Sequence, residues 1–450
     1  MKTLFTRMTL VWATILLSFL ILTSCQYQTQ KTESTKSTIT SSTSDSIKVN
    51  YSTIKYNSQG QQLWLAQYNT PDVSYDQANA IAIDNNGNTY ITGEITIKYD
   101  KNGKQIWLVH EKEMTYSIAV DGIGNVFVSG DNATVKYNKN GNKQWKANSI
   151  SDARNLVIDK SGNVYVAGGG NAGLAVVKYN GSSGKPIWTW ESDYSGRGSS
   201  AFAIALDQYN NVYVTGYIKS ETSIGVSNYL TTKLDNNGHP VWTSTYAGPG
   251  NYDDVAYCVA LDVAGNVYVT GRSFGINNYD YATIKYDSAG NQLWVSRYNG
   301  TANGDDLGYR LIVDSDGAVY VTGESERDNN GRDYATIKYD ANGNQLWVAR
   351  YSESSNSNNE AFALAEDISG NVYVTGQSGV YGSGPGAYST VKYNSDGEQL
   401  WAASYQGPSN GFAQANAITV DEDGNVYVTG ASGRRPEINY LRTTSTQTAR

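Results

Sequence analysis

The chain has 450 residues and a formal net charge of −8, with 34 lysines and arginines against 42 aspartates and glutamates. This acidity disfavours a nucleic acid as the partner, because recognition of a phosphate backbone needs a basic face. The chain contains 2 histidines and 2 cysteines, so a histidine metal site, a histidine general base or a catalytic triad has little support.

The beginning of the chain predicts secretion. Lys2 and Arg7 flank a short apolar run, residues 9–22, which is too short to span a membrane comfortably. The run ends in LTSC, which resembles a bacterial lipobox, and this resemblance implies cleavage before Cys25 and lipidation of that residue. Residues 1–24 are therefore predicted to be a signal peptide. An ordinary cleavage site with a chance cysteine is the alternative.

Residues 25–50 are rich in Ser, Thr, Gln and Lys and contain almost no large apolar residue, so they predict a disordered tether. A lipidated Cys25 would anchor the protein in the bacterial cell envelope, at the outer membrane in an organism with two membranes. Lipidation would also leave Cys258 as the last free thiol, so that no intramolecular disulfide could form.

Most of the chain is a repeat, and residues 255–298 show one unit of it. The unit contains four short segments rich in β-branched and aromatic residues, VAYCVAL, NVYVTG, YATIKY and NQLWVSRY, which predict four strands. A turn of the form Asp-x-x-Gly follows the first segment at Asp262 and the third at Asp287. Such turns make compact hairpins with the glycine in the left-handed region. The unit is therefore predicted to be an antiparallel meander.

The second strand of the unit recurs eight times, and so does the fourth strand, which carries Trp294. Repeats in a fixed order predict a propeller or a solenoid, and four meandering strands per unit favour the propeller. The first recognisable segments, 53–56 and 62–68, have the pattern of a third and a fourth strand. The last segments, 415–421 and 425–430, have the pattern of a first and a second strand.

We therefore predict an all-β fold over residues 51–440, an eight-bladed β-propeller of four-stranded antiparallel blades. The N- and C-terminal half-blades would close it, which leaves no free sheet edge. Residues 441–450 would form a tail. Because residues 439–441 resemble the start of another third strand, a closure with seven blades is the alternative.

The segments NVYVTG, TIKYD and GNQLWV, at these spacings, resemble the bacterial β-propeller repeat (SBBP-type) lipoprotein family over roughly residues 51–440. The turn and tryptophan element, YDxxGxxxW, also resembles the repeats of quinoprotein-type propellers. This second resemblance implies that Trp294 and its equivalents dock between neighbouring blades. Neither resemblance implies one function, since propellers host many.

Two polar positions recur in all eight units, and both are predicted to be structural. The Asp after each first strand, Asp262 in this unit, could begin a calcium loop, but the ligand spacing of an EF-hand is missing. A role as acceptor of turn amides is therefore favoured. The Lys of each third strand, Lys285 here, would be unfavourable in a buried layer unless it were paired. Because strands one and three run the same way, we predict a repeated ion pair between the two positions.

One face of the propeller is predicted to carry the binding site. The links from strand two to three and from strand four to the next blade share that face, and they lengthen in the later units. Acids precede several first strands: Asp76, Asp152, Asp253, Asp254, Asp305, Asp306 and Glu360. If the first strands are innermost, these acids surround the mouth of the central channel. We predict a ligand site there, formed by Asp254, Asp306, Glu360, Tyr252 and Tyr309. Calcium could bind the carboxylates, and solvated surface acids are the alternative.

The predicted function is that of a lipid-anchored binding or scaffold module, a monomer whose partner is a protein or a glycan of the cell envelope. No phosphate loop, zinc motif or GxSxG element is present, and no catalytic residue is predicted. Calcium is the one cofactor considered. The alternative is a propeller enzyme, either a quinoprotein-like oxidoreductase or a carboxylate-dependent hydrolase or lyase. The resemblance to quinoproteins implies a vicinal disulfide, which this chain cannot form.

Overall fold

The structure is a computed structural model. It describes residues 49–70, 76–111, 113–148, 150–170, 173–193, 198–220, 226–250, 252–327, 331–354, 357–379, 386–408 and 411–433. The chain divides into two compact units, Met1–Asp45 and Ser46–Arg450, and every described residue belongs to the second. The predicted signal peptide, the lipidated Cys25 and the tail at 441–450 lie outside the described residues. Of the predicted tether, residues 49 and 50 are described, and both belong to the first strand.

The described residues form 32 strands in eight blades of four antiparallel strands, in agreement with the predicted fold class. One parallel pairing, Arg332 with Asn358, joins two neighbouring blades into a single sheet. Blade 1 contains β3 (Ala80–Ile83), β4 (Thr89–Thr92), β5 (Ile95–Tyr99) and β6 (Gln105–His110). Blade 2 contains β7 (Thr115–Val120), β8 (Val126–Gly130), β9 (Thr134–Tyr137) and β10 (Lys143–Ala147). Blade 3 contains β11 (Ser151–Ile158), β12 (Val164–Gly169), β13 (Leu174–Tyr179) and β14 (Pro186–Glu191). Blade 4 contains β15 (Ser199–Leu206), β16 (Val212–Lys219), β17 (Ser227–Leu234) and β18 (Pro240–Tyr246).

The remaining blades have the same strand order. Blade 5 contains β19 (Asp254–Leu261), β20 (Val267–Phe274), β21 (Tyr279–Tyr286) and β22 (Gln292–Tyr298). Blade 6 contains β23 (Asp306–Val313), β24 (Val319–Glu326), β25 (Arg332–Tyr339) and β26 (Gln345–Tyr351). Blade 7 contains β27 (Asn358–Glu366), β28 (Val372–Gly379), β29 (Gly386–Tyr393) and β30 (Gln399–Tyr405). Blade 8 contains β31 (Phe412–Val420), β32 (Val426–Gly433), β1 (Val49–Tyr56) and β2 (Gln62–Tyr68).

Blade 8 joins the two ends of the repeat, as the sequence predicted. β1 pairs with β32 in an unbroken antiparallel register that runs from Val49 opposite Gly433 to Tyr56 opposite Val426. A buried bond between the Ser52 and Ser432 hydroxyls, 2.6 Å long, crosses this joint. The closure has eight blades, not the alternative seven.

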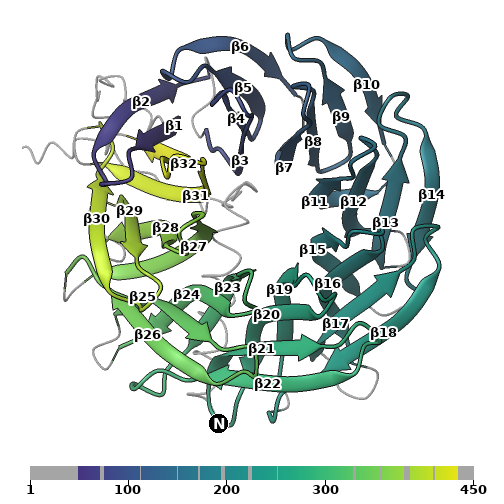
Figure 1. Cartoon of the computed structure of the whole chain (residues 1–450), viewed down its shortest axis with the longest axis vertical. Coiled ribbons are helices and arrows are strands. Elements are labelled where there is room, and N and C mark those ends of the chain that lie inside the picture. The colour runs from purple at the N-terminus through teal and green to yellow at the C-terminus, as the bar shows by residue number, and fades with distance from the viewer. Residues whose placement is uncertain are drawn as a thin grey trace, which may run out of the picture. The chain divides into compact units, whose positions relative to one another are not determined.

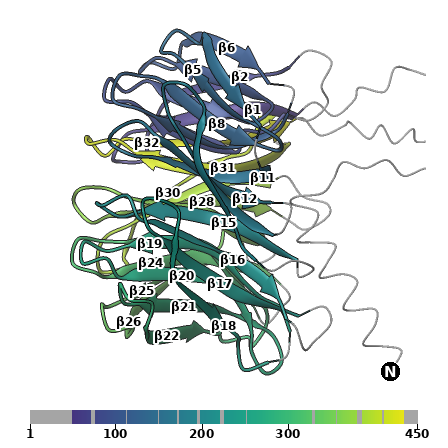
Figure 2. The same ribbon diagram turned by 90° about the vertical axis from the view of Figure 1, so that its right-hand side faces the viewer.

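The first strands of the blades lie innermost. β3, β7, β11, β15, β19, β23, β27 and β31 surround the centre of the ring, and each contacts the first strand of the next blade (Figure 1). Seen from the side, the strands run between the two faces of the ring (Figure 2). Each Asp-x-x-Gly turn therefore lies on the face opposite the start of the first strands. Within the described residues there is no helix that could cross a membrane.

The second and third strands of the later blades are longer than the sequence predicted, because their pairing continues beyond the expected strand ends. In blade 5, β20 and β21 stay paired as far as Phe274 opposite Tyr279, so residues 275–278 alone form the link. The second and third strands of blades 4 to 7 each have eight residues, whereas those of blade 1 have four and five. Paired strands therefore extend to this face over blades 4 to 7 where the structure describes it.

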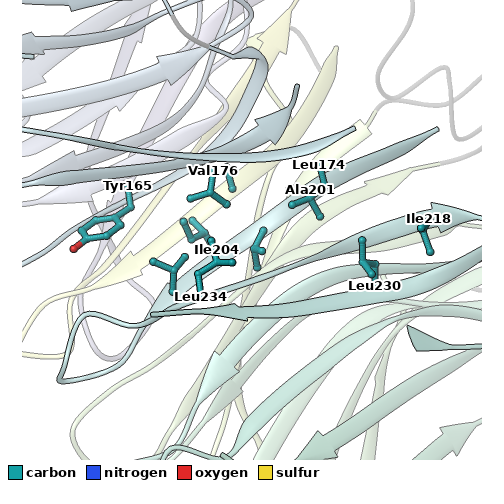
Figure 3. Close-up of a cluster of buried hydrophobic side chains, with 11 residues drawn as sticks. Tyr165, Leu174, Val176, Ala201, Ile204, Ile218, Leu230 and Leu234 are labelled. Carbon is teal, nitrogen blue, oxygen red and sulfur yellow. The ribbon is translucent and has the colours of Figure 1, made fainter. Parts of the chain in front are cut away.

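The core lies between adjacent blades. Figure 3 shows the cluster between blades 3 and 4, where Tyr165 and Val176 pack against Ile204 and Leu234. Buried Val, Ile and Tyr side chains of the second and third strands repeat this packing in every blade. Burial at about 25 cal/mol per Å² of apolar surface makes these interfaces the main source of stability.

The repeated tryptophan docks on the next blade, in agreement with the quinoprotein-type resemblance. The Trp294 indole N–H donates to the Ala341 carbonyl at 3.1 Å, in the following blade. Its ring lies against Gly343, which has φ of +83° and where a Cβ would come within 2.7 Å of the ring. The equivalent indole bond occurs in all eight blades at 2.9–3.1 Å. Trp401 makes it with Ser58, so one such contact also spans the joint between blades 7 and 8.

The repeated lysine has a different partner from the one predicted. The Lys285 ammonium lies over the Tyr268 ring, 4.9 Å from its centroid, and donates to the Ala341 carbonyl at 3.0 Å. All eight lysines lie 4.6–5.1 Å from the centroid of a second-strand aromatic ring. Direct pairs with the turn Asp occur within the described residues at Lys55 with Asp421, 3.7 Å, and Lys392 with Asp367, 3.5 Å. The ion pair predicted for every blade is therefore wrong for Lys285, because a ring face and a carbonyl take the ammonium.

The repeated aspartate is a turn acceptor, as predicted. Asp262 Oδ1 accepts the amides of Ala264 and Asn266 at 3.0 and 2.8 Å. Its Oδ2 accepts from the Asn266 side chain at 2.7 Å and from the Tyr268 hydroxyl at 2.9 Å. Burial raises the pKa of Asp262, but these hydrogen bonds outweigh it and leave the pKa below its usual value. The carboxylate is thus fully used within the turn.

Candidate functional site at the channel mouth

One residue of nearly every first strand is left out of the pairing ladder near the channel mouth. In β19, for example, Ala256 pairs with Gly271 and Cys258 with Thr270, so Tyr257 between them forms a bulge. A bulge redirects the side chain of its extra residue. The bulged residues are half-buried and come from seven of the eight first strands: Tyr116, Arg154, Phe202, Tyr257, Tyr309, Phe362 and Asn416.

Four of these bulged residues form what we call the aromatic arc: Phe202, Tyr257, Tyr309 and Phe362. The ring centroids of successive members lie 5.7, 5.8 and 6.0 Å apart, so the arc is continuous across blades 4 to 7. The Arg154 guanidinium lies 4.6 Å from the Phe202 centroid and extends the arc to blade 3. Tilted rings at these distances attract one another beyond their area of contact.

Arg272 stands beside the arc with its hydrogen-bonding capacity unused. It follows Gly271 in β20 and lies over the Tyr279 ring, 4.9 Å from the centroid. Among the described residues its guanidinium has no hydrogen-bond or salt-bridge partner, and its Nε is buried. Burial alone would lower the pKa of Arg272, but the nearby Tyr257, Tyr279 and Asp253 outweigh it, so the group stays cationic.

Asp253 faces the same place from the end of the link into blade 5. The residue is 8% exposed, and its Oδ1 has no hydrogen-bond partner within the described residues. Asp253 interacts electrostatically with Arg272, Tyr257 and Tyr279. No salt bridge of 4.0 Å or less joins it to Arg272, however. Arg272 and Asp253 therefore lie within electrostatic range of each other without a direct hydrogen bond or salt bridge.

An arginine and two glutamates form the other side of the site. Arg332 donates to Glu324 at 2.7 Å, and the same nitrogen lies 3.7 Å from Glu360. Gln377 donates to the second Glu360 oxygen at 3.2 Å. Burial and then the nearby Glu324 raise the pKa of Glu360 to about 8. Burial raises the pKa of Tyr309, and the glutamates raise it further.

The structure brings together three of the five predicted ligand residues. Tyr309 belongs to the aromatic arc, and Glu360 lies beside it. Tyr252 is 44% exposed and connects to the site through a chain of rings, with Phe274 at 4.4 Å and then Tyr279 at 5.1 Å. Tyr309 lies within electrostatic range of Arg272, and the chain of rings from Tyr252 ends at Tyr279, over which Arg272 lies.

The other two predicted residues, Asp254 and Asp306, point into the protein. Asp254 is 1% exposed and accepts the amides of Gly248 and Phe274 at 2.8 and 3.1 Å. Asp306 is fully buried, accepts the Gly300 amide at 2.7 Å, and has a pKa raised to about 6 by burial. In both cases one of the bonded amides belongs to the residue six positions earlier. This geometry favours a role in closing the link between blades over a role in ligand binding.

A metal site has no geometric support in this part of the structure. Among the described residues, no three or more His, Cys, Asp or Glu side chains gather so that they could hold a metal ion. Calcium binding at Asp254, Asp306 and Glu360 therefore stays a prediction.

Sequence reasoning missed Phe202, Tyr257, Phe362 and Arg272. A signal for the first three was present, because each aromatic residue stands between two small residues, as in Ala-Phe-Ala and Ala-Tyr-Cys. Regular alternation hides such residues, since a bulge shifts them onto the other face of the strand. Arg272 gave no signal, because the equivalent position holds a different residue type in each neighbouring unit.

A family comparison agrees with this architecture. The family model described as outer membrane protein assembly factor BamB (PQQ_2) matches residues 52–224 and 226–450, which is most of the chain. The chain therefore belongs to this BamB (PQQ_2) family. The match shows the β-propeller repeat family, whereas membership of the SBBP-type lipoprotein family stays a prediction.

A solved structure supports the propeller fold of this BamB family member. The structure of the Dos1 propeller superposes with a TM-score of 0.54 at 10% identity, covering 85% of this chain and 95% of that one. BamB from Moraxella catarrhalis superposes with a TM-score of 0.49 at 15% identity, covering 78% and 96%. Among curated proteins, the regulatory protein FlaEY of Caulobacter vibrioides is 31% identical over 134 residues. That match covers 27% of this chain and 14% of the relative's length.

Proposed function

We propose that this protein is a lipid-anchored propeller of the bacterial cell envelope that binds a partner at the channel mouth over blades 4 to 7. The observation that carries the proposal is Arg272, which lies beside the aromatic arc and has no hydrogen-bond partner among the described residues. The recurring Asp262, Lys285 and Trp294 positions, by contrast, are occupied by contacts within and between blades. Half-buried aromatic rings next to an unpaired arginine are typical of binding surfaces.

The family description supports a partner in the cell envelope. It names an assembly factor of outer membrane proteins, which favours a protein partner over a catalytic role. A glycan of the envelope is the other partner class. We expect a monomer, since the ring closes on itself and presents no free sheet edge at the joint between β1 and β32.

The binding proposal is tested by partner capture. Full-length protein would be used to capture envelope components from detergent extracts, with a Tyr257→Ala, Tyr309→Ala double variant in parallel. Tyr209→Ala is the matched control, because Tyr209 is 70% exposed in the tight turn between β15 and β16 on the opposite face. Loss of the captured species in the double variant alone supports the site. Equal capture by all three proteins would exclude it.

The lipid anchor is tested separately. Membrane and soluble fractions of cells producing the wild type and Cys25→Ala would be compared after salt washing. We expect the variant to move to the soluble fraction. If both proteins stay on the membrane, the anchor is wrong, whatever the channel mouth binds.

One observation favours a second candidate, a carboxylate-dependent hydrolase or lyase. Glu360 has a raised pKa and lies beside Arg332, which donates to Glu324, so this group of side chains could supply a carboxyl group as general acid or base. Turnover of envelope polysaccharides, measured with wild type and Glu360→Gln, decides between the two. Turnover that Glu360→Gln abolishes would establish the enzyme, and its absence would leave the binding module.

A further inference from the structure

We propose that the channel mouth binds a neutral saccharide, stacked on the aromatic arc and hydrogen-bonded between Arg272 and Asp253. The inference rests on the proposed binding function and specifies its ligand. It uses three features: an unmatched pair of polar groups, accessible aromatic rings, and a balance of charge.

A ligand that satisfies both polar groups must donate one hydrogen bond and accept another. Arg272 offers donors and Asp253 offers an acceptor, and neither has a hydrogen-bonding partner among the described residues. They attract each other but stay more than 4.0 Å apart. A hydroxyl group placed between them can accept from the guanidinium and donate to the carboxylate at the same time. Neighbouring hydroxyls of a sugar repeat this ability along one edge of its ring, whereas a carboxylate ligand would satisfy Arg272 and oppose Asp253.

The aromatic rings offer a surface on which a sugar ring can stack. Tyr257 and Tyr309 are half-buried. Their hydroxyl groups have no hydrogen-bond partner in the described part of the chain. An aromatic ring can cover the C–H face of a sugar while hydroxyl groups bond around its edge, because Tyr combines an apolar body with a polar tip. Successive rings at 5.7–6.0 Å give an oligosaccharide a continuous track over several blades.

The charges point to a neutral ligand. Each arginine at the mouth has an acidic neighbour: Arg154 is 2.7 Å from Asp152, and Arg332 is 2.7 Å from Glu324. Arg272 has Asp253 within electrostatic range. The site therefore presents opposite charges in balance, which would not select strongly for an acidic or a basic peptide.

Calorimetry on the full-length protein tests the proposal. The detergent must carry no sugar head group, so lauryldimethylamine oxide replaces the alkyl maltosides. The probes are maltohexaose, cellohexaose and the hexamer of N-acetylglucosamine, each titrated to millimolar concentration. We expect at least one to bind, with a loss of affinity of at least tenfold for Tyr257→Ala and for Arg272→Met.

Two variants keep the test independent of folding. Tyr257→Phe retains the stacking ring and should lose less than Tyr257→Ala, whereas Tyr209→Ala on the opposite face should bind as the wild type does. The melting temperature of every variant is measured alongside. Binding that is unchanged in Tyr257→Ala and Arg272→Met would overturn the proposed site.

The remaining outcomes separate this inference from the proposed function. If none of the three oligosaccharides binds, the saccharide proposal fails. Envelope capture that still depends on Tyr257 and Tyr309 would then indicate a peptide ligand and leave the proposed function standing. If capture is also insensitive to those residues, both proposals fail.

Discussion

Replacing Trp401 by Ala should open the ring at the joint between its two ends. Trp401 lies in β30 of blade 7, and its indole bonds to Ser58 at 3.0 Å in the β1–β2 hairpin. Its ring lies against Gly60 and between Tyr56 and Tyr373, with centroids 6.3 and 5.9 Å away. The hairpin formed by β1 and β2 joins blade 8 through non-covalent contacts alone, because its pairing partner β32 lies at the other end of the repeat.

The expected cost follows from these contacts. Loss of the hydrogen bond costs about 1 kcal/mol, and loss of two ring pairs costs roughly 0.5–1.5 kcal/mol each. A total of about 3 kcal/mol agrees with the lower range for truncating a large aromatic residue. With an unfolding entropy of about 2.1 cal/mol/K per residue, a propeller of about 400 residues should melt roughly 4 °C lower.

Hydrogen exchange read by mass spectrometry distinguishes this joint from an ordinary interface. Trp294→Ala is the matched control, because Trp294 makes the same contacts between blades 5 and 6. Both variants should melt at similarly reduced temperatures. Protection in β1 and β2 should fall in Trp401→Ala alone, since that hairpin has no covalent link to blade 7. Unchanged protection in β1 and β2 would refute the reasoning.

Three further outcomes are expected. Gly343→Ala should lower the free energy of unfolding by roughly 2–4 kcal/mol, whereas Gly265→Ala should lower it by only about 1 kcal/mol, as measured by thermal unfolding. Both glycines have positive φ, but a Cβ at Gly343 would meet Trp294 at 2.7 Å, whereas a Cβ at Gly265 would meet nothing nearer than 3.9 Å. Asp306 has a folded pKa of about 6, above its unfolded value, so it favours folding at low pH and this stability is lost between about pH 4 and 6. Asp306→Asn should remove that slope from the denaturant midpoints and leave the protein no less stable at pH 7.5; a variant that keeps the slope would reject the assignment. A double-mutant cycle should give a larger coupling for Lys392 with Asp367, 3.5 Å apart, than for Lys285 with Asp262, whose lysine bonds to Ala341 instead.

The fold could be predicted because the same strand and turn pattern occurs eight times in the sequence. The turn Asp262 and the docked Trp294 each recur at one position per unit, and the phase of the repeat revealed the composite blade. The partner of Lys285 could not be predicted, because the same spacing fits an ion pair and a position over the Tyr268 ring.

The candidate site was predicted only in part, for a physical reason. Acids before the first strands are alike in sequence, yet Asp254 accepts two backbone amides while the adjacent Asp253 has an oxygen without a partner among the described residues. A single step along the chain reverses the direction of the side chain, and the sequence does not fix where the strand begins. Tyr257 was missed for a related reason, since a bulge breaks the alternation from which inward positions are inferred.

Blade 8 can form only after its C-terminal strands, β31 and β32, have been synthesised. Ser52 and its partner Ser432 are 380 residues apart, so at roughly 5–20 residues per second about 20 to 75 s of synthesis separate them. During that time β1 has one edge without its partner, and such edges invite pairing with other chains. Lys55 lies in β1, and a charged side chain in an unpaired edge strand disfavours pairing with another chain. In the complete ring the same ammonium lies 4.6 Å from the Tyr427 centroid and 3.7 Å from Asp421, and both residues belong to the β31–β32 hairpin. The lysine charge that disfavours pairing of the exposed edge is therefore matched by an aromatic ring and a carboxylate once β32 pairs with β1.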